Sequence, residues 1–343
     1  MNQIPPTMKA LVLQDNPEAR IELKTNYPTP TLKAGQALIK LKTAALNHRD
    51  QWCREGMYPG LRYPSILGSD GCGTVVAVAD EADQHWVGKD VLMNPNVNWG
   101  DNPAFQSLNY SILGMPTDGT FAEYLALPAH RLHEKPAYLS DEAAAAIPLA
   151  ALTAYRAVFT KGLAANGSKV LVTGIGGGVA QFAFQLAQAA GAKVYVTSGS
   201  DEKLDQMRQA GAAGAVNYKD PQWVKTLIKA EPMGFHTIID SAGGDAFGEL
   251  AKMLAQGGTM VVYGTTAGKP SGIHLPRLFF SQASITGSTM GNDQEFVDML
   301  AFMAKHQIQP LVSSVRPLDD IVSAFDEMDQ GRQFGKLVIR ISE

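Results

Sequence analysis

The 343-residue chain contains only two cysteines, Cys53 and Cys72. Two cysteines cannot form a disulfide framework or supply the four thiolates of a structural zinc site. Positive charge is not in excess either, because 29 Lys and Arg face 33 Asp and Glu and give a net charge of -4. A protein that tracks the phosphate backbone needs clustered basic residues, so we expect no nucleic-acid partner.

The sequence also lacks a segment typical of a membrane span or an export signal. The longest apolar stretch, 143–155, is too short to cross a bilayer and contains Pro148. Residues 1–6 lack a basic region followed by an apolar stretch. We therefore expect a cytoplasmic protein without a membrane partner, and its length indicates two domains.

The pattern of apolar residues changes along the chain. In the first third, short β-branched or alternating segments such as 37–41 and 73–78 are bounded by Gly and Pro, and no useful helical period occurs. From Lys169 onward, strands alternate with amphipathic helices, which predicts a parallel sheet covered on both faces. Residues 143–146 are interpreted as an alanine-rich linker. The expected strands of the second region are 169–173, 193–197, 215–217, 237–240, 259–263 and 284–288.

A glycine-rich turn joins the first of these strands to the following helix. It reads Gly174-Ile175-Gly176-Gly177-Gly178-Val179-Ala180. A pyrophosphate needs backbone N–H groups at a helix N-terminus and a close approach that side chains would prevent. The flanking strand and helix, and a second strand ending about 20 residues later, are the context of a dinucleotide-binding fingerprint. We therefore expect a dinucleotide site, with an unliganded tight turn as the alternative.

The end of the second strand favours NADP over NAD. A carboxylate there would accept hydrogen bonds from the ribose of NAD, whereas the 2′-phosphate of NADP requires donors and positive charge. The chain has Ser198 at this point and Lys203 one helical turn later. Asp201 and Glu202 lie where the first turn of a helix favours acids for its own stability. Tyr218 follows the third strand and either closes over the adenosine phosphate or is a buried tyrosine.

Further motifs are spread over nearly the whole chain. They are Asn47-His48-Arg49-Asp50, residues 64–75, residues 119–124, Leu152-Thr153-Ala154-Tyr155, Asp240-Ser241-Ala242-Gly243-Gly244 and Gly335-Lys336. Together with the glycine turn, they resemble the medium-chain dehydrogenase/reductase superfamily. The resemblance implies an α/β protein with a GroES-like β-rich catalytic domain, 1–149 completed by 289–343, and a Rossmann domain with a doubly wound parallel sheet, 150–288.

The residues at the metal positions of this superfamily predict that zinc is absent. Zinc alcohol dehydrogenases carry a cysteine, a His-Glu pair and a further ligand where this chain has Asn47, Ser69-Asp70 and Leu149. Catalytic zinc needs three N, S or O ligands and one open position, which these residues do not provide. The stretch 93–115, which matches the structural zinc lobe, contains no cysteine. The chain therefore resembles the zinc-independent quinone oxidoreductase-like branch.

This resemblance implies an NADPH-dependent oxidoreductase that transfers hydride, without a metal, to a quinone or an α,β-unsaturated carbonyl. Positioning and hydrogen-bond donors would stabilise the negative charge, which such acceptors delocalise. Asn47 would lie near the reacting carbonyl or the nicotinamide ribose, Trp52 and Tyr58 would line the pocket, and Asp50 would orient Arg49. Two alternatives stay open, a zinc-type alcohol dehydrogenase and an NADPH-binding sensor or structural protein with little turnover.

The resemblance also implies the cofactor contacts and the oligomeric state. The segment 285–288 is expected to be the edge strand of the nucleotide-binding sheet, which in this family commonly pairs across a two-fold axis, so we expect a homodimer. The expected cofactor-binding residues are Asn47, Thr153, Gly174, Gly176, Gly177, Gly178, Val179, Ser198, Lys203, Tyr218, Ala242, Gly264, Thr265 and Ser288.

Overall fold

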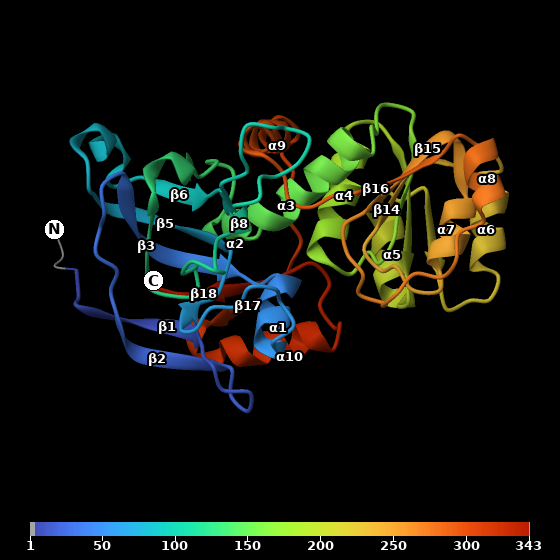
Figure 1. Cartoon of the computed structure of the whole chain (residues 1–343). Coiled ribbons are helices and arrows are strands. Elements are labelled where there is room, and N and C mark those ends of the chain that lie inside the picture. Colours follow the sequence, from blue (N-terminus) through green and yellow to red (C-terminus); the bar gives the residue numbers. More distant parts are fainter. Residues whose placement is uncertain (1–3, 343) are drawn as a thin grey trace. The chain divides into compact units, whose positions relative to one another are not determined.

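The computed structural model describes residues 4–342, which fold into two compact units (Figure 1). Unit 1 contains the described residues up to Leu149, the segment Asn292–Val297 and the described residues from Gln309 onward. Unit 2 contains Ala150–Gly291 and Asp298–Ile308. Residues 298–308 thus group with unit 2, although the resemblance places them in the catalytic domain. Residues 1–3, part of the N-terminal stretch considered for an export signal, lie outside the described residues.

The largest sheet of unit 1 has seven strands, and its central strand belongs to the first third of the chain. Its strands are β3 (Gln36–Ala45), β5 (Asp70–Val78), β6 (Asp90–Met93), β9 (Tyr124–Pro128), β10 (Leu132–Glu134), β17 (Val312–Pro317) and β18 (Lys336–Arg340). β3 pairs antiparallel with β5, β9 and β18. Because β17 and β18 come from the end of the chain, the tail completes the sheet that the N-terminal segment begins.

Two smaller sheets and a buried apolar core complete the β-structure of unit 1. In the core, the rings of Phe121 and Phe325 meet edge to face with centroids 6.1 Å apart. Phe325 belongs to helix α10 (Ile321–Asp329), so this helix covers the sheet interior. The smaller sheets contain β1 (Thr7–Leu13), β2 (Ile21–Pro28) and β4 (Ser65–Ile66), and β7 (Asn96–Val97) and β8 (Ser111–Ile112).

Helix α1 (His48–Glu55) corrects the expectation that the first third contains no helix. It begins after Asn47, whose backbone N–H donates to the Asp50 carboxylate at 2.8 Å. It ends at Gly56, where a φ of +79° suits glycine. The sequence hides this helix because its inward face is polar: Arg49 and Asp50 are buried, where the usual helical pattern has apolar residues.

Helix α2 (Asp141–Ala145) occupies the stretch interpreted as a linker, so that interpretation was wrong. The Ser140 hydroxyl caps the helix by accepting from the N–H of Ala143 at 3.1 Å. Ala143, Ala144 and Ala145 are buried, and the helix packs on β3 and β5. The small side chains allow this close packing, which composition alone does not distinguish from a flexible linker.

Unit 2 contains the predicted parallel sheet. Its six strands have the order β13-β12-β11-β14-β15-β16, and every neighbouring pair is parallel. This confirms the expected α/β class and places the segment around 285–288 at the sheet edge. The strands are β11 (Lys169–Val172), β12 (Lys193–Ser198), β13 (Gly214–Asn217), β14 (Phe235–Asp240), β15 (Leu254–Val262) and β16 (Ser284–Gly287).

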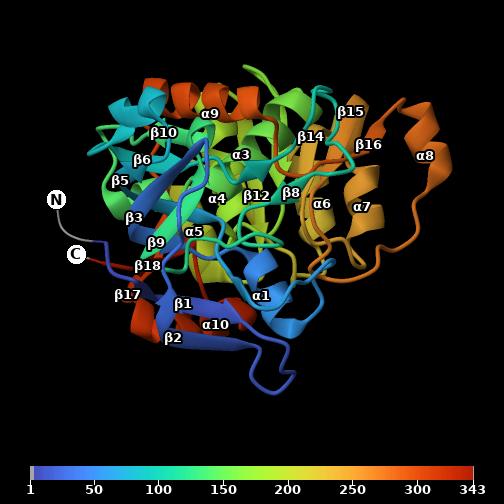
Figure 2. The ribbon, with the colours of Figure 1, turned by 60° about the vertical axis from the view of Figure 1, so that its left-hand side comes forward.

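Helices connect these strands and cover both faces of the sheet. Helices α4 (Gly178–Ala189) and α5 (Asp201–Gln209) join β11 to β12 and β12 to β13, so the chain moves toward one edge of the sheet. Helices α6 (Trp223–Ala230) and α7 (Phe247–Lys252) join β13 to β14 and β14 to β15, so the chain moves toward the other edge. Right-handed connections therefore put α6 and α7 on the face opposite α4 and α5. Figure 2 shows α6 and α7 side by side, away from α4. Helix α8 (Leu275–Phe280) joins β15 to β16, whereas α3 (Pro148–Tyr155) precedes β11 and α9 (Asp293–His306) follows β16.

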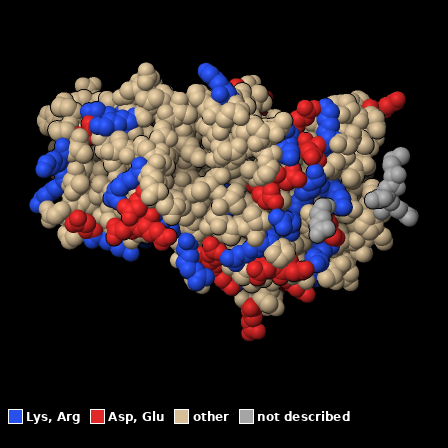
Figure 3. Space-filling view, turned by 180° about the vertical axis from the view of Figure 1, so that it is seen from behind, with Lys and Arg blue, Asp and Glu red and all other residues tan. Residues whose placement is uncertain are grey.

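Two surface properties bear on possible partners. Within residues 4–342, no helix is long and apolar enough to cross a membrane. On the face drawn in Figure 3, the acidic and basic side chains of the described residues are interspersed. That face therefore presents no extended basic area of the kind that nucleic-acid binding uses.

Candidate functional site

The glycine turn of unit 2 leaves its backbone open to a ligand. It links β11 to α4, with Gly178 and Val179 as the first helical residues and Gly177 as the residue that precedes them. Gly174 has a φ of +62°, and a Cβ built on Gly177 would meet no described atom within 4 Å. The turn therefore combines a helix N-terminus with room for a phosphate group.

The ends of β12 and β13 lie beside each other and carry two of the predicted cofactor residues, Ser198 and Tyr218. The backbone N–H of Tyr218 donates to the Ser198 carbonyl at 3.1 Å, and Ser198 Oγ accepts from the N–H of Ser200 at 3.1 Å. A Cβ on Gly199 would lie 2.7 Å from the Tyr218 hydroxyl, so glycine gives this tyrosine its room. Lys203 is in the first turn of α5, where burial lowers its pKa.

The acidic residues of this region are engaged in stabilising α5. Asp201 accepts a hydrogen bond from Asn217 Nδ2 at 2.8 Å, and Ser200 Oγ accepts from the N–H of Lys203 at 3.4 Å as the helix cap. Asp201 and Glu202 lie in the first helical turn, as expected. Ser198 and Lys203, the predicted donors to a 2′-phosphate, lie at the end of β12 and in the first turn of α5.

The remaining predicted residues of unit 2, apart from Thr153, follow strands β14, β15 and β16 at the carboxyl edge of the same sheet. Ala242 and Gly264 follow β14 and β15, and the backbone N–H of Thr266 donates to the Ser241 carbonyl at 3.0 Å. Ser288 follows β16, and its buried hydroxyl has no partner among the described residues. Thr265 Oγ1 donates to the Gly268 carbonyl at 2.7 Å. In α3, Thr153 Oγ1 contacts Met290 Sδ at 3.7 Å.

One residue that positions this edge was missed. Asp240 is fully buried and accepts from Thr173 Oγ1 at 2.6 Å and from the N–H of Gly243 at 2.9 Å. It therefore ties the end of β11, just before the glycine turn, to the end of β14. The motif that contains Asp240 was recognised, but a carboxylate at a strand end does not by itself reveal its partners.

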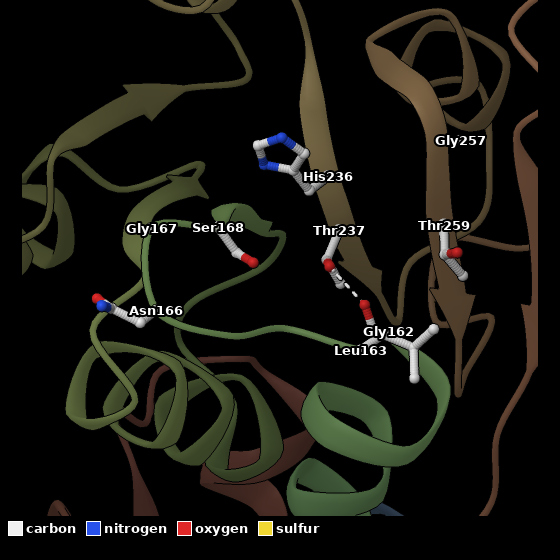
Figure 4. A pocket seen from close by; sticks show the side chains of 9 residues that line it. All are labelled: Gly162, Leu163, Asn166, Gly167, Ser168, His236, Thr237, Gly257 and Thr259. Carbon is white, nitrogen blue, oxygen red and sulfur yellow. Dashed lines mark hydrogen bonds between the residues drawn. The ribbon is translucent and has the colours of Figure 1, made fainter.

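A cavity of about 350 Å³ opens at the opposite end of this sheet (Figure 4). Ser168, which precedes β11, and His236, near the start of β14, are among its lining residues. There Thr237 Oγ1 donates to the Gly162 carbonyl at 2.7 Å. The cavity lies at the amino ends of the strands, whereas the glycine turn lies at their carboxyl ends. It is therefore separate from the predicted dinucleotide site.

Unit 1 contains a buried polar cluster around Asn47. The ammonium group of Lys336 donates to Asn47 Oδ1 at 2.7 Å, to the Leu46 carbonyl at 2.7 Å and to Asp70 Oδ2 at 2.9 Å. Asn47 Nδ2 donates to the same Asp70 oxygen at 2.9 Å, and the N–H of Leu149 donates to Asp70 Oδ1 at 2.7 Å. Because Lys336 needs an acceptor, these contacts fix which way the Asn47 amide faces.

A second buried network surrounds Arg49, the residue two positions after Asn47. Its Nη1 donates to Ser69 Oγ at 2.6 Å and to the Leu113 carbonyl at 2.8 Å, and Nη2 donates to the Met115 carbonyl at 3.3 Å. Nε donates to the Tyr58 hydroxyl at 3.3 Å, and the guanidinium carbon lies 4.7 Å from the centre of the Tyr58 ring. The network joins α1 to the segment around 113–115.

Asp50 has a different partner from the one expected. Its Oδ2 accepts from the backbone N–H of Asn47, and its Oδ1 has no partner among the described residues, so Asp50 forms no hydrogen bond with Arg49. Burial raises the pKa of Asp50 to about 6, against the lowering effect of the Arg49 charge. Trp52 is half-buried, and its backbone carbonyl accepts from the N–H of Met57 at 2.9 Å near the end of α1. Asp50 therefore holds the backbone of Asn47 in place.

The residues at the zinc positions do not fit that metal. Asn47 Oδ1 already accepts from Lys336, and Asp70 Oδ2 accepts from both Lys336 and the Asn47 amide. Asp70 Oδ1 accepts from the backbone N–H of Leu149. The side chain of Leu149 has no atom that could bind a metal. Burial raises the pKa of both Cys53 and Cys72 to about 12, which disfavours the thiolate that zinc binds. Across residues 4–342, no group of three or more His, Cys, Asp and Glu side chains is placed to hold a metal ion.

Comparison with known proteins agrees with this architecture. Residues 33–137 match the family "Alcohol dehydrogenase GroES-like domain", and residues 178–305 match "Zinc-binding dehydrogenase". The chain is 37% identical over 331 residues to "Zinc-type alcohol dehydrogenase-like protein YogA" of Leptosphaeria maculans, covering 91% of this chain and 92% of the relative. It is 29% identical to "Acryloyl-coenzyme A reductase" of Sulfurisphaera tokodaii, covering 97% and 100%. A crystal structure of an NAD-dependent alcohol dehydrogenase superposes with a TM-score of 0.91 at 35% identity, covering 98% and 100%.

A GroES-like unit together with a parallel-sheet unit and its glycine turn define an oxidoreductase that uses a pyridine nucleotide. More particularly, the chain belongs to the medium-chain dehydrogenase/reductase superfamily, among proteins named zinc-type alcohol dehydrogenase-like.

Proposed function

We propose that this oxidoreductase transfers hydride from NADPH to a quinone or an α,β-unsaturated carbonyl without a metal ion. The observation that carries the proposal is the Asn47 cluster. Zinc dehydrogenases hold a metal that polarises the substrate oxygen. At that position this chain has the amide of Asn47, which accepts a hydrogen bond from the ammonium group of Lys336. An acceptor whose double bonds delocalise the incoming negative charge depends least on a Lewis acid.

The residues at the carboxyl edge of the unit 2 sheet fit a dinucleotide, which supplies the hydride from its nicotinamide ring when bound. The backbone from Gly174 to Val179 would hold the pyrophosphate, and Ser198, Lys203 and Tyr218 would surround the 2′-phosphate. Ser288, with its unpartnered buried hydroxyl, offers a donor near the end of β16. The amide of Asn47 donates one Nδ2 hydrogen to Asp70, which leaves the other for the substrate or the nicotinamide ribose.

The names of relatives support the acceptor class only in part. Acryloyl-CoA is an α,β-unsaturated thioester, and the reductase named for it is similar to this chain over nearly its full length. Other relatives are named as alcohol dehydrogenases, two of them NAD-dependent.

A screen of quinones and enones with NADPH, followed by the nicotinamide absorbance, tests the proposal. We expect at least one acceptor to accelerate NADPH oxidation well above background, in protein whose metal analysis shows no stoichiometric zinc. One zinc per chain together with alcohol oxidation would instead establish a zinc-type alcohol dehydrogenase. Tight NADPH binding without turnover of any acceptor would identify a sensor or structural protein.

The cofactor preference has its own test in Lys203→Met. A hydrogen bond from a charged group contributes about 1.5–3 kcal/mol, so we expect the Kd for NADPH to rise about tenfold or more while the Kd for NADH changes little. Lys229→Met, which removes an exposed lysine from α6, is the control. Equal effects of Lys203→Met on both cofactors would contradict the assignment of Lys203 to the 2′-phosphate.

A further inference from the structure

The guanidinium group of Arg49 is a buried charge without a hydrogen-bonded carboxylate. Arg49 is 6% exposed, and its neighbour Asp50 acts on it electrostatically but forms no hydrogen bond with it. Four of its five N–H groups donate, to Tyr58, Ser69, Leu113 and Met115. Among the residues that the structure describes, the second Nη2 hydrogen therefore has no acceptor. Burying a cation without a hydrogen-bonded carboxylate costs free energy of folding.

A second unsatisfied donor lies near Arg49. The hydroxyl of Tyr110, next to β8, is buried and has no partner among residues 4–342. Tyr110 is within electrostatic range of both Tyr58 and Arg49, and burial raises its pKa, so the hydroxyl stays neutral and able to donate. A spare guanidinium hydrogen and a spare phenol hydrogen in one neighbourhood are complementary to an oxygen that carries negative charge.

We propose that Arg49 is a catalytic residue that donates its free Nη2 hydrogen to the substrate oxygen that gains negative charge during reduction. The inference rests on the proposed function and extends it. Ser69, which the guanidinium binds, stands where zinc alcohol dehydrogenases have a metal ligand, so a fixed organic cation takes over the electrostatic role of the metal. Asp70, the residue next to Ser69, accepts from both Asn47 and Lys336.

The chemical step balances without a change in Arg49. Hydride forms a new C–H bond at the β-carbon of the enone, the electron pair of the C=C bond moves toward the carbonyl oxygen, and the nicotinamide is oxidised. The resulting enolate oxygen accepts from Arg49, and a solvent proton then completes the saturated carbonyl. Arg49 keeps its own protons throughout, because its pKa is too high for it to act as an acid.

The competing interpretation is that Arg49 only fastens the segment around 113–115 to α1. Binding of 4-nitrophenol to the protein saturated with NADP⁺ distinguishes the two, because the phenolate mimics the charged oxygen and absorbs differently from the phenol. A cation at hydrogen-bond distance lowers the pKa of an anionic group by about 1–3 units. We therefore expect the bound probe to ionise about one unit or more below its pKa in solution in the wild type, and Arg49→Gln to abolish this shift.

Variants provide the controls. Arg54→Gln removes a guanidinium from the same helix, where Arg54 pairs with Asp326 at 2.7 Å, and it is expected to leave the probe shift unchanged. Arg49→Lys keeps the positive charge but loses the planar guanidinium, so the pKa of the bound probe should still be lowered, by less than in the wild type. If Arg49→Gln does not fold, this variant distinguishes the two interpretations. On an active acceptor, Arg49→Gln should lower kcat/KM about 100-fold, the usual effect of removing an oxyanion donor, with an unchanged Kd for NADPH.

The outcomes separate the two proposals. A wild-type protein that does not shift the probe, or an Arg49→Gln variant that keeps the full shift, would overturn the role of Arg49, whatever the activity. If Arg49→Gln has a lower thermal midpoint but the kcat/KM of the wild type, the only role of Arg49 is to attach the segment around 113–115 to α1. If the wild type shifts the probe but oxidises NADPH with no quinone or enone, the anion site stands and the proposed acceptor class fails.

Discussion

Lys336 combines burial with a complete set of partners. It is 3% exposed, and its three N–H groups meet acceptors on Leu46, Asn47 and Asp70. The partners are separated from it by more than 260 residues of sequence, since 336 and 70 differ by 266. The N-terminal segment and the C-terminal strand β18 are thus joined by a buried ion pair, Lys336 with Asp70, beside Asn47.

The Lys336→Met substitution tests what this pair contributes to stability. Breaking a buried pair leaves an uncompensated charge and costs about 3–5 kcal/mol, so we expect the free energy of unfolding in urea to fall by that amount. The double variant Lys336→Met with Asp70→Asn removes the stranded charge and should recover part of the loss. A single variant within about 1 kcal/mol of the wild type would show that Asp70 is not held by this contact.

Asp50 predicts a pH dependence of stability with a definite sign. Its pKa in the folded protein is about 6, above the ordinary value of 3.8, so the native state binds the proton more tightly than the unfolded state does. The stability from this carboxyl is therefore present below pH 3.8 and is lost as pH rises through about 6. Two pKa units correspond to about 3 kcal/mol.

Asp50→Asn should remove this dependence because the amide does not ionise. We expect the unfolding free energy of the variant, relative to the wild type, to rise by about 3 kcal/mol between pH 4 and pH 7 in urea titrations. The amide oxygen still accepts from the Asn47 N–H, so the cap is preserved. A difference between the two proteins that stays constant across this range would show that Asp50 keeps an ordinary pKa.

At the scale of single elements, a substitution in the glycine turn should weaken cofactor binding while it leaves the stability of the fold nearly unchanged. Gly177 has φ -83° and ψ 155°, which any residue adopts, and a Cβ there meets no described atom. Gly177→Ala should therefore change the unfolding free energy by less than about 1 kcal/mol. Overpacking a fitted site costs about 1–3 kcal/mol, so the Kd for NADPH, measured by fluorescence, should rise at least about fivefold.

Gly272→Ala is the matched control for this prediction. Gly272 has equally open surroundings and lies outside the turn, so its variant should bind NADPH like the wild type. If Gly177→Ala binds NADPH as tightly as Gly272→Ala does, the pyrophosphate does not approach the backbone at Gly177.

Elements whose core face is apolar were predictable, and elements whose core face is polar or made of alanine were not. Strands β11, β12 and β14 and helices α4, α5 and α7 follow the alternation that the sequence indicates, because each buries apolar residues. Helix α8, which the sequence pattern did not predict, has no buried residue. Helix α1 buries Arg49 and Asp50 instead, and α2 buries alanines, so neither shows the usual period. The missed elements are informative for function, since α1 carries Asn47 at its start and the guanidinium that we assign to the substrate oxygen.

For the whole molecule, the sequence motifs indicated which residues matter but not which of them meet. The contacts of Arg49 with Leu113 and Met115 span 64 and 66 residues and cross a stretch without a recognisable pattern. Local spacing suggested that Asp50 would orient its neighbour Arg49, whereas the tertiary structure gives Arg49 carbonyl and hydroxyl partners from other elements. Partners of this kind follow from chain topology, which local periodicity does not specify.

The assembly that we predict for the whole protein is a homodimer formed through unit 2. Strand β16 is the edge of the six-stranded sheet, and an uncovered edge offers its backbone groups for pairing. Helix α8, which directly precedes it, exposes Phe279 (61%) and Phe280 (75%), unusually large apolar side chains for a solvated surface. A two-fold axis beside β16 would cover both features at once and extend the sheet into the second copy.

Sedimentation velocity of wild type and variants tests this assembly. We expect the wild type to sediment at about twice the 36.7 kDa mass of one chain, and the double variant Phe279→Asp with Phe280→Asp to sediment as a monomer, because two carboxylates would be buried on pairing. Met233→Asp, which places a carboxylate on another exposed apolar residue of the same unit, is the control and should remain a dimer. A wild-type monomer, or a double variant that still dimerises, would show that the edge and α8 do not form the interface.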